Sequence, residues 1–257
     1  ALDLLATEAL DAGARGDDES HAGLCANVMA YMVLDWARFT DWRLWLARFE
    51  AVDARLGTTN DINVQLARAT GAVIAALLRG DAFETLAPLG ERLETLAALS
   101  TDPVQASLAA AALLPWLQMS RNTAGAQMLK TNMSAMADGW SLDKLGERYL
   151  RGVWLADWAQ HSYATDQTRF PEAVASMSAY LDKYPMPALQ FRRARWNGEQ
   201  RIAQQDVAGA EKAQREMLAA MHPKRAMDRA TFNAQVSSLA CLTGDTERAQ
   251  LHVKHML

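Results

Sequence analysis

The stretch from Ala194 to Pro223, ARWNGEQRIAQQDVAGAEKAQREMLAAMHP, decides the fold. It predicts a helix, a tight turn at Gln205-Asp206 and a second helix, because aspartate is a preferred N-cap residue. Gly198 and several alanines allow the two helices to approach closely, and Pro223 ends the pair. Such a pair cannot bury its apolar sides alone, so copies of it must stack on either side.

Copies of this unit recur along the chain, and each is marked by an aspartate or asparagine in a turn. These residues follow one another at steps of 39 to 44 positions: Asp41, Asp81, Asn122, Asp166, Asp206 and Asp245. A period of this size is typical of helical-pair solenoids. The sequence therefore predicts an all-α fold, a right-handed α-solenoid of antiparallel helix pairs with about 40 residues per repeat. We expect residues 1–257 to form a single domain of this kind.

The apolar periodicity between these turns predicts about six first helices and seven second helices. They are expected at Leu2–Ala14, Ser20–Ala37, Asp41–Leu56, Asp61–Leu78, Ala82–Leu99, Pro103–Met119, Asn122–Ala137, Ser141–Ser162, Pro171–Lys183, Pro187–Gln204, Asp206–Met221, Lys224–Leu242 and Asp245–Leu257. Pro88 and Gly90 predict a kink or a late start in the fifth helix. Asp102-Pro103 is a strong start signal for the sixth helix.

Composition narrows the classes of protein. The chain has 257 residues, half of them hydrophobic, and a formal net charge of −4, which disfavours contact with nucleic acid or an anionic membrane. Cys25 and Cys241 stand near opposite ends, so we expect a reducing compartment, the cytoplasm, and no disulfide framework. No apolar run reaches the length of a membrane span. The chain begins inside a helical pattern, so we expect a fragment of a larger multidomain protein.

Two resemblances follow from these units. The Ala194–Pro223 unit resembles a tetratricopeptide repeat through Gly198, Ala210 and Ala213, although Ala194 and Arg201 hold the places of the usual aromatics and the period exceeds 34. Turns such as RGDAFETL, from position 79, and TGDTERAQ, from position 243, resemble the central helical repeats of large ATP-dependent LuxR-type bacterial regulators, the maltose-activator-like proteins. That resemblance implies a sensor or docking domain between an ATPase and an output domain.

The expected function follows from this resemblance and from the missing motifs. The chain has no Walker-type GxxxxGK[ST] and no basic recognition helix, so it is neither the ATPase nor the output domain. We expect a non-catalytic recognition module of a bacterial signalling or transcription-regulatory protein, which binds a protein segment or a small effector in its groove. Two alternatives are an enzyme with its site on the irregular Ser141–Phe170 repeat and a pure oligomerisation scaffold. The latter, or an unpaired first helix, would favour a homodimer.

Aromatic residues supply the candidate ligand site. Tryptophans and phenylalanines around the first turn are interpreted as packing between helices: Trp36, Phe39, Trp42, Trp45 and Phe49. On the helix at Ser141–Ser162, one side carries Trp154, Trp158 and His161. Packing against neighbouring helices explains this side, and a ligand-binding wall is the alternative. Secondary candidates on neighbouring first helices are Trp116 and Trp196.

Other reactive residue types suggest little chemistry. No GxSxG, HExxH or catalytic cysteine motif is present, and Cys25 lies on an apolar helix face that predicts a buried thiol. His252 and His255 lack further metal ligands nearby, so neither a metal nor another cofactor is predicted.

Three arginines form a basic cluster on one helix. Arg192, Arg193 and Arg195 are the candidate anion or acidic-peptide site, although three residues so close together on a helix cannot all face one way. Because the rest of the chain is acidic, we expect no direct contact with nucleic acid. Neighbouring Lys224 belongs to a second basic segment one helix later.

Overall fold

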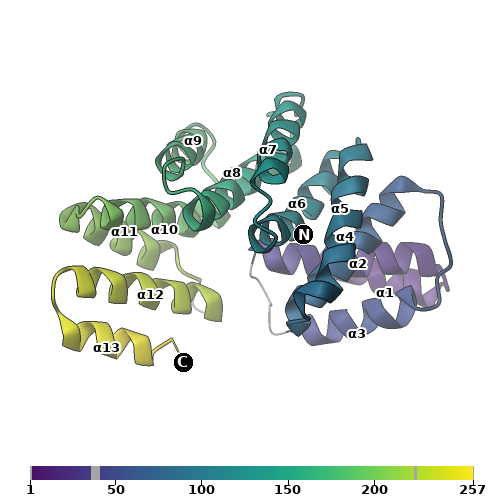
Figure 1. Ribbon diagram of the computed structural model, residues 1–257, viewed down its shortest axis with the longest axis horizontal. Coiled ribbons are helices and arrows are strands. Elements are labelled where there is room, and N and C mark those ends of the chain that lie inside the picture. Colours follow the sequence, from purple (N-terminus) through teal and green to yellow (C-terminus); the bar gives the residue numbers. More distant parts are fainter. Residues whose placement is uncertain (1, 36–40, 223–224, 257) are drawn as a thin grey trace. The chain divides into compact units, whose positions relative to one another are not determined.

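The computed structural model is all-helical in the part of the chain that it describes, residues 2–35, 41–222 and 225–256 (Figure 1). Thirteen helices lie within these ranges: α1 Leu2–Ala14, α2 Asp18–Asp35, α3 Trp42–Asp53, α4 Ile62–Arg79, α5 Phe83–Leu99, α6 Pro103–Met119, α7 Thr123–Asp138, α8 Leu145–Thr165, α9 Phe170–Lys183, α10 Pro187–Ala203, α11 Val207–Ala220, α12 Ala226–Leu242 and α13 Thr246–Lys254. The all-α prediction is confirmed. The right-handed solenoid geometry with about 40 residues per repeat stays a prediction.

Five turns between neighbouring helices share one local structure. A residue with positive φ ends the first helix, and the next residue is aspartate or asparagine: Gly16-Asp17, Gly80-Asp81, Arg121-Asn122, Gln205-Asp206 and Gly244-Asp245. In each turn the N–H of the aspartate or asparagine donates to the carbonyl five residues earlier, at 2.9–3.0 Å, as in a Schellman motif.

The side chain of the same residue then starts the next helix in four of these turns. The side chains of Asp17, Asn122, Asp206 and Asp245 accept a hydrogen bond from the backbone N–H three residues ahead, at 2.8–3.1 Å. Asp81 instead pairs with Arg79. One residue therefore closes the first helix through its N–H and caps the second through its oxygen.

The predicted turn positions all lie at helix boundaries. Asp41, Asn122, Asp206 and Asp245 are the N-cap residues of α3, α7, α11 and α13, Asp166 follows α8, and Asp81 lies between α4 and α5. Asp102 caps α6 through Val104 N–H at 2.8 Å, with Pro103 in the first turn, as predicted. The residues Trp36, Phe39, Pro223 and Lys224 lie outside the described residues.

Two helices differ from the sequence prediction. Helix α5 begins at Phe83 and continues through Pro88, so of the predicted kink or late start the late start is excluded, and the kink stays a prediction. Helix α8 begins at Leu145, four residues later than predicted, because the Glu147 carboxylate accepts from the Ser141 N–H at 2.6 Å and from Lys144 Nζ at 2.9 Å, which fixes a turn there.

The chain forms two compact units, Ala1–Trp140 and Ser141–Leu257. In the first unit, α2, α4 and α6 pack on one another and the other helices pack on them. Helix α6 shows why: its residues from Ala106 to Leu114 are all buried, and a helix that is apolar all round belongs in the interior. That a single domain spans residues 1–257 stays a prediction.

In the second unit, α8 packs on α10 and α10 packs on α12, while α9, α11 and α13 each pack on the helix that precedes them (Figure 1). Gly198 of α10 permits a close approach to α12, whereas the sequence predicted one to its pair partner α11. A Cβ at this position would overlap the carboxamide of Gln235 on α12. The fully buried Trp196 and Phe170 fill the space between α10 and its neighbours.

Gln205 provides a test of the turn structure. It has a φ of 58°, a conformation that costs a non-glycine residue about 1–2 kcal/mol. We expect Gln205→Gly to raise the free energy of unfolding of the second unit by about 0.5–1 kcal/mol. Urea unfolding followed by circular dichroism measures it.

The neighbouring Gln204 is the matched control, because it is equally exposed and has ordinary helical φ and ψ of −84° and −1°. Gln204→Gly is expected to lower the stability. Equal effects of the two substitutions would show that the positive φ at Gln205 carries no strain.

Candidate functional site

The three first-choice ligand residues lie together on α8. The Trp154 and Trp158 ring centroids are 5.9 Å apart, and those of Trp158 and His161 are 5.3 Å apart. Their exposed fractions are only 5–7%. Because these rings are buried, a ligand would reach them only after neighbouring segments moved. In this structure they act as packing.

Trp196 belongs to a second aromatic cluster in the same unit. Its ring centroid lies 5.4 Å from Tyr163 and 6.1 Å from Phe170, and the Arg195 guanidinium lies 4.0 Å from the ring centroid. Burial lowers the pKa of Arg195 to about 10, so its side chain stays charged at neutral pH. A buried guanidinium is stabilised here by the ring face and by the nearby Glu199 carboxylate.

The three arginines of the candidate anion site point to different partners, as their spacing required. Arg192 pairs with Asp157 of α8, and Arg193 pairs with Asp182 of α9 at 2.5 Å. Burial raises the pKa of the Asp157 carboxyl, and the Arg192 guanidinium opposes that rise. An anion at Arg192 or Arg193 would have to displace a carboxylate of the protein itself.

A polar chain that the sequence did not reveal joins α8, α10 and α12. The Tyr163 hydroxyl donates to the Glu199 carboxylate at 3.2 Å, and Gln235 Nε2 donates to the other carboxylate oxygen of Glu199 at 3.2 Å. Gln235 Nε2 also donates to the Arg195 carbonyl at 2.8 Å. Tyr163 and Glu199 are 36 residues apart, and so are Glu199 and Gln235. This equal spacing was the signal in the sequence that could have indicated the chain.

Trp116, the other secondary candidate, lies in the first unit and packs on α5. A Cβ at Gly90 would overlap the Trp116 indole, so glycine makes the notch in which that ring lies. The ring stacks on Phe83 with centroids 5.4 Å apart, and its Nε1–H donates to Glu94 at 2.7 Å. Trp116 is 4% exposed, which makes it a packing residue here too.

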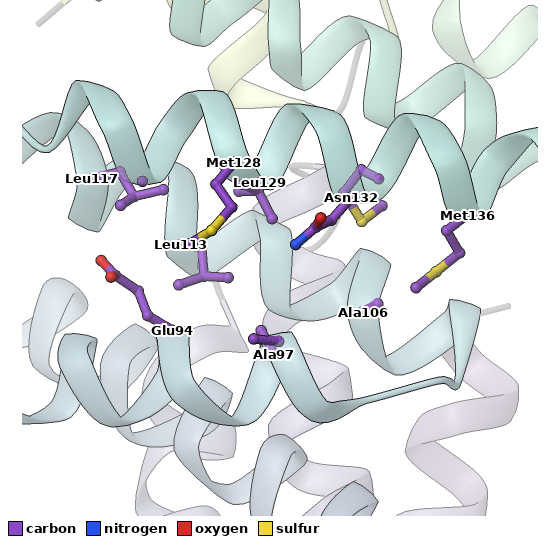
Figure 2. A pocket seen from close by; sticks show the side chains of 12 residues that line it. Glu94, Ala97, Ala106, Leu113, Leu117, Met128, Leu129, Asn132 and Met136 are labelled. Carbon is purple, nitrogen blue, oxygen red and sulfur yellow. The ribbon is translucent and has the colours of Figure 1, made fainter.

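Next to this tryptophan, α5, α6 and α7 enclose an apolar groove (Figure 2). Helices α5 and α7 both pack on α6, which forms the floor. In Figure 2, Met128, Leu129 and Asn132 point from α7 toward the helix that carries Glu94 and Ala97. The groove is lined by Glu94, Ala97, Ala98, Ala106, Leu113, Leu117, Gly125, Met128, Leu129, Asn132, Met133 and Met136. Its cavity volume is ≈ 50 Å³.

Methionines give the α7 wall of this groove an adaptable surface. Met128, Met133 and Met136 line it, and Met128 is 57% exposed. Unbranched thioether side chains change rotamer at little cost and fit partners of varied shape. Sequence reasoning missed these residues because it searched first helices for aromatics, whereas the repeated methionines on one side of a second helix were the informative pattern.

The chain supplies few groups for covalent or metal chemistry. Within the described ranges, no group of three or more His, Cys, Asp or Glu could hold a metal ion. The Cys25 thiol is fully buried, and burial raises its pKa to about 11. None of the described helices combines the length and the apolar character needed to cross a membrane.

Comparison with known proteins adds no assignment: no family model, curated protein or solved structure matches the chain.

The Gly90 notch beside the groove gives a stability prediction. Gly90→Ala would force a methyl group into the Trp116 indole, and overpacking of this kind costs about 1–3 kcal/mol. Guanidinium unfolding followed by tryptophan fluorescence measures the change. Gly23→Ala in α2 is the control, because its Cβ would meet only Ala67 at 3.9 Å. We expect the free energy of unfolding of this control to rise by about 0.5–1 kcal/mol. If Gly90→Ala leaves the free energy of unfolding unchanged, Gly90 is not needed to accommodate the Trp116 ring.

The two thiols give a second prediction. Cys25 is buried and Cys241 is exposed, so at about pH 8 one thiol per chain should react rapidly with a disulfide reagent and the other only after unfolding. Absorbance of the released thiolate measures both steps. In Cys241→Ser the rapid step should vanish while the slow step remains. Two rapid thiols in the native protein would contradict the packing of α2.

Proposed function

We propose that this chain is a non-catalytic recognition module and that its α5–α7 groove binds a segment of a partner protein. The observation that supports it best is the groove itself, an apolar trough between two helices with exposed methionine on one wall. Apolar surface of this kind marks binding sites in water-exposed proteins. Grooves between helices recurrently accept an amphipathic helix of a partner.

The size of the groove favours a protein segment over a small effector. Sites for small molecules have volumes of about 300–1,000 Å³. The cavity here, at ≈ 50 Å³, has room for one or two inserted side chains. The remainder of a partner helix would lie along α5 and α7 above the floor of α6, where Met128 is already exposed.

The charge of the groove limits which residues the partner segment can carry. Glu94 is the charged residue among those that line the groove, and one of its oxygens accepts from Trp116 Nε1. The other oxygen can accept a hydrogen bond from a lysine or arginine of the partner. The proposed partner is therefore an amphipathic helix with an apolar face and one basic residue at the Glu94 end of the groove.

The type of parent protein is part of the same proposal. The turns RGDAFETL and TGDTERAQ resemble the helical repeats of large bacterial ATP-dependent regulators, in which this region would connect an ATPase to an output domain. A docking groove suits such a place, because its partner helix could come from another part of the signalling machinery. In this proposal the module works in the cytoplasm.

Binding of a designed peptide tests the proposal. The probe is a fluorescein-labelled helix with leucines at i, i+3, i+4 and i+7 and one lysine, and its comparison has the same composition without an apolar face. We expect fluorescence anisotropy to show binding of the first peptide only. Met128→Glu should weaken it at least about tenfold, because it places a buried charge against apolar side chains.

Met227→Glu is the matched control, since Met227 is an exposed methionine of α12 outside the groove. It should bind like the wild type. Circular dichroism confirms that both variants fold. If the two peptides bind equally, or if Met128→Glu binds as tightly as Met227→Glu, the groove is not the docking site.

A further inference from the structure

A second concave site lies in the unit Ser141–Leu257, among α11, α12 and α13. Helices α11 and α13 both pack on α12, near the C-terminal end of the chain (Figure 1). A pocket with a cavity volume of ≈ 310 Å³ opens between them, at the lower limit of small-molecule sites. Its size separates it from the narrow groove of α5–α7.

One part of this pocket is apolar. Phe232 and Val236 of α12 form its base, and Leu218 of α11, 55% exposed, forms a side. Phe232 also packs against the buried cluster of Phe191 and Met217, so the base is anchored in the core of the unit. This surface can hold an aliphatic or aromatic group.

The other part is cationic. Arg215 of α11 and Arg248 of α13 both line the pocket. Neither guanidinium makes an ion pair or a hydrogen bond with a residue in the described part of the chain. By contrast, Arg169, Arg192, Arg193 and Arg201 of the same unit each pair with an aspartate. Two arginines at one pocket, neither paired with a carboxylate, favour the binding of an anion.

His252 lines the same wall of the pocket. Asn233 Oδ1 lies 2.8 Å from His252 Nδ1, and Asn233 Nδ2 donates to the His255 carbonyl at 3.4 Å, so the amide oxygen faces the ring. Nδ1 therefore carries the proton of the neutral ring, and Nε2 is left as an acceptor for water or a ligand hydroxyl. Burial lowers the pKa of His252, and the charges of Arg248 and His255 lower it further, so the ring is neutral at neutral pH and the two arginines carry the positive charge of the pocket.

Among the described residues that line the pocket, Glu211 is the single carboxylate. Two arginines outweigh it, so the local charge favours an anion at neutral pH. Glu211 makes no ion pair with Arg215 one helical turn away, although both belong to α11. A ligand carboxylate can therefore approach Arg215 without breaking a contact within the protein.

We propose that this pocket binds a small amphipathic carboxylate, with its head group between Arg215 and Arg248 and its apolar body on Phe232 and Val236. The inference is independent of peptide docking at α5–α7. It assigns a low-molecular-weight effector to the second unit, where no ligand displaces an internal salt bridge.

Octanoate is the probe for this site. Isothermal titration of the whole chain should show saturable binding at millimolar octanoate, one ligand per chain. Arg215→Gln and Arg248→Gln should each weaken it about fivefold, the size expected for loss of one charge-assisted contact at an accessible site. Both side chains are exposed, so both variants should fold, and their melting curves verify it.

The matched controls are Lys212→Gln of α11 and Lys254→Gln of α13, which remove the same charge from the same helices outside the pocket. They should bind octanoate as the wild type does, and octan-1-ol and inorganic phosphate should bind at least about tenfold more weakly. The proposal is overturned by absent octanoate binding, by equal loss in the lysine variants, or by octanol or phosphate that binds as tightly as octanoate. These outcomes leave the peptide experiment unaffected.

Discussion

The pairing of helices through a left-handed residue followed by aspartate or asparagine is the constraint on which the rest of the structure depends. The backbone N–H of the aspartate or asparagine closes one helix, and in four turns its side chain caps the start of the next. Because the turn is so short, the two helices must run antiparallel and pack against each other. Every pair then has an apolar side that only neighbouring pairs can cover.

Neighbouring pairs cover that side by placing alternate helices inside. Helices α2, α4 and α6 do this in one unit, and α8, α10 and α12 do it in the other. The inner helices have little surface left for ligands, which explains why Trp116, Trp158 and Trp196 are buried. Space remains where two outer helices rest on one inner helix. Both the α5–α7 groove and the α11–α13 pocket have this arrangement.

The two sites differ because their lining side chains differ. Alanine, leucine and methionine make the first narrow and apolar, with Glu94 as its charged residue. Arg215 and Arg248 make the second cationic above an apolar base formed by Phe232. The same backbone arrangement thus supports recognition of a partner helix in one unit and of a small anion in the other.

The sequence by itself determined the helices and their turns. Local signals carry this information, since Asp206 and Asp245 cap helices within their own segments and apolar periodicity needs only neighbouring residues. It also indicated that Arg192, Arg193 and Arg195 would diverge, because that follows from helical geometry. Pro88 lies inside α5, so it does not delay the start of that helix, and the alternative of a kink there stays a prediction.

Only the tertiary structure decided which apolar faces are covered. Periodicity shows that Trp154 and Trp158 share a side of α8, but burial depends on helices distant in sequence. In the same way, Arg215 and Arg248 are brought to one pocket by the packing of α11 and α13 on α12. The sites are formed by packing between helices that are distant in sequence, and the local spacing of residues does not show this packing.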